Sequence, residues 1–255
     1  YADAPYNTET DYPADNSRVV VMGLCPSAMT TADSHTTYSL PSRAGLTDVL
    51  VTPNGVTGSR KQPFGQALEF AHAAVRIVLK ARRTDNTVGK LYVKNLKLTV
   101  PARLVCGGLK WDTGAKQYLA APAAADLVIN HSGQILSTED TQVAVFYLTP
   151  CSPADLLTDL TGTGGTPGLT LTADVAKDIN FTTGARNASF PILDGNLNFM
   201  DQFGSPATQL KGGESYETTL KFDIDSFTLE GEEKEWEDGG KMTVPVVVPE
   251  PTPGP

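Results

Sequence analysis

"SYETTLKFDID", residues 215–225, alternates apolar and polar side chains without a break, and this period of two is typical of a β-strand that buries one face. The apolar face would carry the side chains of Tyr216, Thr218, Leu220, Phe222 and Ile224. An α-helix would not keep these residues on one side, because it turns once in about 3.6 residues. Beyond Ser226 the apolar residues fall on odd positions, so the sequence predicts a bulge or bend there.

Short apolar runs of similar character recur along the chain and are separated by residues typical of turns. They comprise residues 18–24, 48–52, 91–100, 126–130, 141–150 and 169–175. The 255 residues include 23 glycines and 18 prolines, which fits a chain with many turns. Short strands at even spacing are typical of sandwiches and barrels, so we predict an all-β fold.

The stretch "LEFAHAAVRIVLKA", residues 68–81, is ambiguous by pattern alone, because its apolar residues fit helical and strand spacing equally well. The β-branched residues Val75, Ile77 and Val78 favour a strand for its second half. We therefore interpret the stretch as a buried strand. In this interpretation His72 is a packing residue and not a ligand.

Charge and composition exclude several classes of function. The formal net charge is −9, and no basic cluster is longer than "KARR" at residues 80–83, so we expect no nucleic-acid partner. No run of 18 apolar residues occurs that could form a transmembrane helix. The chain begins with Tyr1 and a polar stretch, and we expect residues 1–17 to be a flexible segment left after truncation or processing that removed a leader or a longer N-terminal piece.

No catalytic or metal-binding motif stands out. His35, His72 and His131 lie in no hydrolase or zinc motif, and a hydrolase that uses His72 or His131 is only a third hypothesis. The cysteines Cys25, Cys106 and Cys151 lack zinc spacing; buried thiols are favoured, with one disulfide as the alternative.

Three further segments resemble ligand-binding loops but lack essential residues or have a simpler explanation. The glycine-rich segment 161–168 lacks the lysine of a phosphate-binding loop. Segment 194–204 has no glycine at the sixth position, where a calcium loop requires one, and Ser205 stands at the position of the bidentate glutamate. The acidic run 230–240 is interpreted as a solvated turn, with divalent-ion binding as the alternative. We therefore expect no enzyme activity, cofactor or metal.

Four short motifs occur in a characteristic order along the chain: residues 68–81, "VFYLTPC" (145–151), "LKGGESYETTLKFDI" (210–224) and "WEDGG" (236–240). This order resembles the fimbrillin family, which are pilus subunits of Gram-negative anaerobes. The positions that match the family are Phe70, His72, Gly213, Tyr216, Trp236 and Gly239.

The resemblance implies two transthyretin-like β-sandwich domains in tandem and export as a lipoprotein precursor to the outer membrane. It also implies that subunits of the fimbrium join by strand exchange, so the expected partners are other pilin subunits. Membrane contact is expected only through a lipid anchor on the precursor. The polar stretch 131–141 is the natural crossing between domains, which gives an N-terminal domain at 18–135 and a C-terminal domain at 136–255 with a Pro-rich tail.

The C-terminal stretch "KMTVPVVVPEPTPGP", residues 241–255, is the candidate for an exchanged strand. The strand residues would be Thr243, Val244, Val246, Val247 and Val248. Prolines at 245 and 249 remove amide donors along one edge only, because neighbouring residues of a strand face opposite ways. A donor strand, an edge strand of the chain's own domain and a disordered tail all remain open.

We therefore expect a structural or tip pilin at the cell surface that contributes to adhesion. The alternative is a surface-anchored binding module for a host glycan or protein, built on the same scaffold and not polymerised. The candidate exposed aromatic residues for that role are Trp111 and Tyr118.

Overall fold

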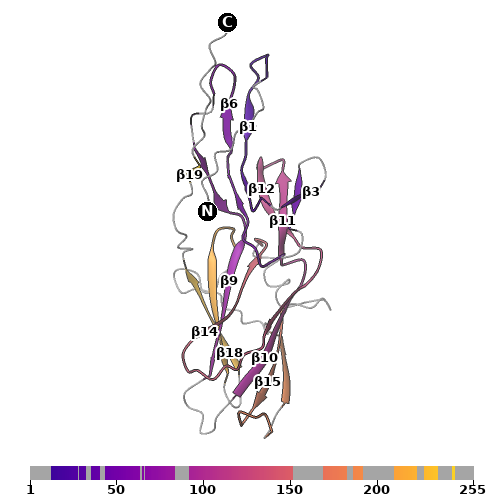
Figure 1. Cartoon of the computed structure of the whole chain (residues 1–255), viewed down its shortest axis with the longest axis vertical. Helices are drawn as coiled ribbons and strands as arrows, with labels where there is room; N and C mark the ends of the chain where they lie inside the picture. The colour runs from indigo at the N-terminus through magenta and orange to yellow at the C-terminus, as the bar shows by residue number, and fades with distance from the viewer. Residues whose placement is uncertain are drawn as a thin grey trace.

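The computed structural model describes residues 13–27, 29–32, 36–40, 44–63, 65, 67–83, 92–151, 169–182, 186–191, 210–222, 227–234 and 243–244. Every regular secondary-structure element within these residues is a β-strand, so the predicted all-β class is confirmed. The molecule is elongated, and two hydrophobic cores follow one another along its length (Figure 1).

The larger core lies between two four-stranded sheets in the lower half of Figure 1. The first sheet has the order β13 (Leu127–His131), β10 (Tyr92–Val100), β15 (Thr170–Ala176) and β16 (Arg186–Pro191). The second has the order β14 (Thr141–Leu148), β9 (Val75–Arg83), β17 (Ser215–Phe222) and β18 (Phe227–Lys234). Apolar side chains of both sheets meet in between, and Leu98, Phe146 and Phe222 are at most 2% exposed. This arrangement is a β-sandwich.

Strand β17 has the alternation expected from its sequence. The side chains of Tyr216, Thr218, Leu220 and Phe222 are buried, whereas those between them are half-buried. Ser226, near which the sequence predicts a bulge or bend, lies outside the described residues. The strands on either side of it, β17 and β18, form an antiparallel pair in which Phe222 lies opposite Phe227.

The smaller core lies between two further sheets in the upper half of Figure 1. One consists of β2 (Leu24–Cys25), β5 (Leu50–Val51) and β8 (Ala71–His72). The other has the order β12 (Gln117–Pro122), β11 (Cys106–Asp112), β4 (Thr37–Ser39) and β3 (Thr30–Ala32). Val51 and Leu109 from the two sheets are buried in the same cluster.

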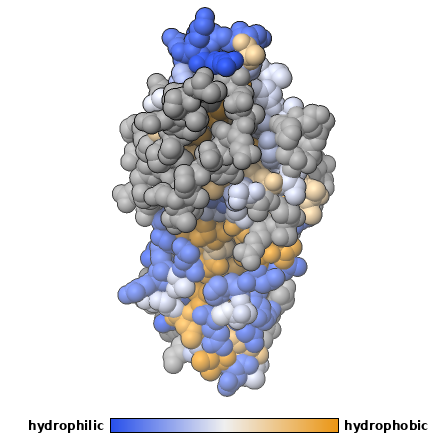
Figure 2. Space-filling view, turned by 45° about the horizontal axis from the view of Figure 1, so that its top comes forward, coloured by the Kyte–Doolittle hydropathy of each residue, from blue (hydrophilic) through white to orange (hydrophobic). Residues whose placement is uncertain are grey.

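A two-stranded ribbon, β1 (Val19–Val21) with β6 (Val56–Gly58), extends the upper end of the molecule. This end is strongly hydrophilic on the face shown in Figure 2. Part of the predicted flexible segment 1–17 lies beside it: the Asn16 side chain accepts a hydrogen bond from the Lys61 amide at 2.8 Å. Residues 13–17 are thus held by hydrogen bonds, and residues 1–12 lie outside the described part.

The ambiguous stretch 68–81 is extended, as interpreted from its β-branched residues. It forms β7 (Leu68–Glu69), β8 and most of β9 in succession. The chain passes from the upper core to the lower one at two adjacent alanines. The Ala73 amide donates to the Val49 carbonyl at 2.8 Å, and the Ala74 carbonyl accepts from the Gly213 amide at 2.9 Å. One extended segment therefore belongs to both cores.

Strand pairs cross the predicted domain boundary at residue 135. Strand β14, which follows the boundary, pairs with β9, which precedes it. Strand β10 likewise pairs with β15, and both strands line the larger core. The upper core instead combines an early part of the chain with β11 and β12. A polar stretch such as 131–141 marks a surface crossing, but it carries no information about which strands pair across it.

Candidate functional site

The pairing of a strand near the C-terminus with β7 is the first candidate site. Strand β19 (Thr243–Val244) runs antiparallel to β7, with Thr243 opposite Glu69 and Val244 opposite Leu68. The candidate residues Val246, Val247 and Val248 lie outside the described residues. The pair thus joins residues far apart in the chain, beside the upper core (Figure 1).

The second feature is a contact between an imidazole and a carboxylate beside the sheet β2-β5-β8. The Nδ1 atom of His72 lies 2.7 Å from Oδ2 of Asp48, and the two side chains are 13% and 25% exposed. The other Asp48 oxygen accepts a hydrogen bond from the Val49 amide at 2.8 Å. His72 is therefore a largely buried side chain that is paired with Asp48.

The cysteines do not form a nucleophilic site with His72. Cys25 lies opposite Leu50, which in turn lies opposite His72, so an entire strand separates the thiol from the imidazole. Burial raises the pKa of the Cys25 thiol, and the Asp48 carboxylate raises it further. Burial also raises the pKa of Cys106 to about 12. Both shifts disfavour the thiolate, which is the nucleophilic form. No disulfide bond joins the three cysteines, all of which lie in the described part of the chain.

An aromatic cluster lies on β4, β11 and β12 at the margin of the upper core. The Trp111 and Tyr118 rings are 5.1 Å apart at an interplanar angle of 67°, and the Tyr38 and Tyr118 rings are 5.5 Å apart at 73°. Trp111 and Tyr118 are only half-exposed. The side chains of Tyr38 and Tyr118 pack against buried residues of the upper core. Burial raises the pKa of Tyr118 to about 12, with a further contribution from Tyr38. The sequence analysis did not identify Tyr38, because the local sequence does not indicate how its strand β4 is aligned with β11.

The matched positions Gly213 and Tyr216 lie where β17 begins, beside the crossing between the cores. Gly213 has a φ of 83°, a left-handed conformation that favours glycine. The Tyr216 side chain is 1% exposed, and its hydroxyl donates to Oε2 of Glu214 at 2.7 Å. The Phe70 ring lies against Gly23, which precedes β2. These residues position the chain, and none of them presents a free reactive group.

Several sequence predictions lie outside the described residues. These are His35, Trp236, Gly239, the glycine-rich segment 161–168, segment 194–204 and Ser205. The part of the chain that is described contains no group of three or more metal-ligating side chains. It also contains no helix that is long and apolar enough to cross a membrane.

Comparison with known proteins gives similarity only among solved structures. No family model and no curated protein sequence match this chain. A candidate cell adhesion protein from Bacteroides uniformis aligns with a TM-score of 0.47 and 12% identity over 88% of this chain and 75% of that one. A fimbrial protein from Bacteroides vulgatus has a TM-score of 0.41 and 12% identity over 88% and 79% of the two chains. The tip fimbrial protein Mfa3 from Porphyromonas gingivalis has a TM-score of 0.37 and 12% identity over 78% and 70%.

Proposed function

We propose that this chain is a structural or tip subunit of cell-surface fimbriae, that it joins other pilin subunits by strand exchange, and that it contributes to adhesion. In this proposal the protein is exported, is attached to the outer membrane through a lipid anchor on its precursor, and is not an enzyme. The order of the four sequence motifs supports the proposal. So does the pairing of β19 with β7.

The β19–β7 pair carries the proposal because it is short and is made through the backbone. Only two residue pairs join the strands in the described part of the chain. Backbone hydrogen bonds to a strand edge do not depend on which molecule supplies the second strand. The same segment of a neighbouring subunit can therefore replace β19 on β7 in the same register.

The partner of residues 243–244 also bears on the kind of subunit. A stalk subunit needs both a strand to donate and a groove to receive one, whereas a tip subunit needs only the groove. Thr243 and Val244 pair with β7 of their own chain. This favours a tip subunit, or a closed monomer that opens on assembly, over a subunit with a free C-terminal strand.

Electron microscopy of cells with and without the gene tests this function. We expect fewer surface filaments in the deletion strain, and filaments labelled by an antibody to the chain in the parent strain. Complementation with a chain that lacks residues 243–248 separates assembly from export, because surface labelling should persist while incorporation into filaments is lost. Unchanged filament abundance together with unlabelled filaments contradicts the proposal.

The aromatic cluster favours the second candidate function, a binding module for a glycan or host protein on the same scaffold. The half-exposed Trp111 ring stands at the margin of a rigid cluster, and aromatic rings supply apolar faces for recognition. A glycan array with the intact protein and with Trp111→Ala tests this function. Leu119→Ala is a suitable control, because Leu119 lies on the adjacent strand β12 and is 41% exposed. An array without hits contradicts the glycan version.

A further inference from the structure

We propose that the parallel pair of β9 and β17 is a mechanical clamp that resists extension of the molecule along its long axis and carries tension across the junction of the two cores. This inference goes beyond the proposed function, because it holds for the isolated chain whether or not the chain polymerises.

The first part of the clamp is one continuous extended segment. Residues 68–83 run from β7 through β8 into β9, and they pair successively with β19, with β5, and with β14 and β17. Force applied at Glu69 on β7 therefore reaches the lower core through covalent bonds. It enters β9 at its upper end, where the Arg76 amide donates to the Glu214 carbonyl at 3.0 Å.

The direction of pairing determines how this force is resisted. Strands β9 and β17 are the only parallel pair among the described strands, and they stay in register from Arg76 opposite Ser215 to Arg83 opposite Phe222. When the upper end of one parallel strand and the lower end of the other are pulled apart, all pairs are loaded at once. When both strands are pulled at the same end, the pairs break one after another. Pulling at opposite ends therefore meets a higher barrier, and the height of this barrier sets the rate of forced unfolding.

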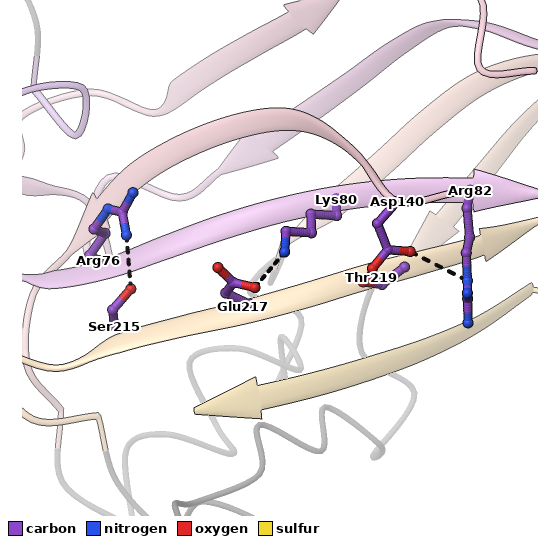
Figure 3. Close-up of polar contacts among 7 residues, drawn as sticks. All are labelled: Arg76, Lys80, Arg82, Asp140, Ser215, Glu217 and Thr219. Carbon is purple, nitrogen blue, oxygen red and sulfur yellow. Dashed lines mark hydrogen bonds and ion pairs between the residues drawn. The ribbon is translucent and has the colours of Figure 1, made fainter. Parts of the chain in front are cut away.

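Side chains on the outer face join the same strands (Figure 3). Nζ of Lys80 lies 2.5 Å from Oε2 of Glu217, and Nη1 of Arg76 donates to the Ser215 hydroxyl at 3.3 Å. Asp140, just ahead of β14, completes the series. It pairs with Arg82 at 3.4 Å and accepts from the Thr219 hydroxyl at 3.2 Å. Three adjacent strands are thus linked across their outer face at successive levels.

Side chains on the inner face of β9 and β17 also join the two strands. Tyr216, Leu220 and Phe222 from β17 and Ile77 and Ala81 from β9 all belong to the larger core. Sliding β17 along β9 would move these side chains out of a closely packed interior, so the core resists the same displacement as the hydrogen bonds.

Single-molecule force spectroscopy tests the clamp. Azide-bearing residues at positions 69 and 221 provide handles at opposite ends of the pair, and handles at positions 69 and 211 load β17 from its upper end. Azide handles leave the three native cysteines unchanged. The two variants must first have the same melting temperature, which shows that the handles do not change the stability of the fold. We expect a severalfold higher rupture force for the 69/221 handles. Equal forces in the two geometries would overturn the proposal.

A variant pair tests the contribution of the side chains. Lys80→Met removes the ammonium group but keeps most of the side-chain length, and it should lower the rupture force for the 69/221 handles. Lys110→Met is the matched control, because Lys110 is exposed on β11 in the upper sheet. An equal loss of force in the two variants would contradict the assignment of the clamp to β9 and β17.

Discussion

The imidazole of His72 lies 2.7 Å from the Asp48 carboxylate, Nδ1 to Oδ2, and this contact joins β8 to the residues that precede β5. It occurs where the chain passes from one core to the other. His72 is therefore fixed by packing and by its contact with Asp48.

Replacing His72 with alanine should destabilise the protein without affecting any catalytic property. Removal of the imidazole leaves the partly buried Asp48 carboxylate without this contact, which costs about 1–3 kcal/mol of unfolding free energy. Urea denaturation measures this loss. His131→Ala is the control: His131 is half-buried, and no hydrogen-bond partner of its Nδ1 occurs in the described structure, so we expect a loss below about 1 kcal/mol. Equal losses in the two variants would contradict a structural role for the His72–Asp48 pair.

Gly213→Ala should destabilise the junction through backbone strain. A Cβ atom at this position would come no closer than 3.5 Å to the His72 carbonyl, so space is not limiting. The φ of 83° is the cause, because a left-handed conformation costs an L-residue about 1–2 kcal/mol. Gly114→Ala in the exposed β11–β12 turn is the matched control and should have a smaller effect. Thermal unfolding compares the two, and a neutral Gly213→Ala variant would contradict the explanation.

Thr218→Val should preserve or increase stability. Thr218 is 3% exposed in the larger core, and its hydroxyl has no hydrogen-bond partner in the part of the chain that is described. Valine has nearly the same shape and removes this buried polar group, so a gain of up to about 1 kcal/mol is expected. Thr219→Val on the outer face loses the bond to Asp140 and should be neutral or slightly destabilising. Guanidinium denaturation ranks the two variants, and a large loss for Thr218→Val would show that the hydroxyl is satisfied.

The Tyr118 phenol should titrate late in the folded protein. Burial raises its pKa to about 12, against about 10 in an unfolded chain, so folding favours the neutral phenol. Its contribution to stability is complete below the unfolded value and is lost as the pH rises towards the folded value. Ultraviolet titration of the tyrosines should show a late component that disappears in Tyr118→Phe. A late component of unchanged size in the variant would contradict this assignment.

The sequence predicts individual strands well wherever one face is buried. In β17 the alternation of Tyr216, Thr218, Leu220 and Phe222 appears directly in their burial. The β-branched residues of 75–78 likewise indicated the strand β9. These predictions succeed because the period of two is a local property of the chain.

Pairing between distant strands is not a local property, and there the predictions fail. Nothing in the sequence of β9 indicates that its neighbours are β14 and the parallel strand β17. The pairs of β9 with β14 and of β10 with β15, which cross residue 135, could not be predicted for this reason. The contact of Asp48 with His72 and that of Tyr38 with Tyr118 were missed on the same ground, since each depends on strand register.

Cross-linking across the β19–β7 pair tests the central claim, exchange of this strand between subunits, most directly. Thr243 lies opposite Glu69, so one chain with Glu69→Cys and another with Thr243→Cys are mixed, assembled into filaments and analysed by mass spectrometry of the disulfide-linked peptides. A single chain with both substitutions is the control for pairing within the monomer. The account predicts a disulfide between residue 69 of one chain and residue 243 of the other in filaments. Filaments without this link, from chains whose doubly substituted control forms it internally, would contradict strand exchange at this edge.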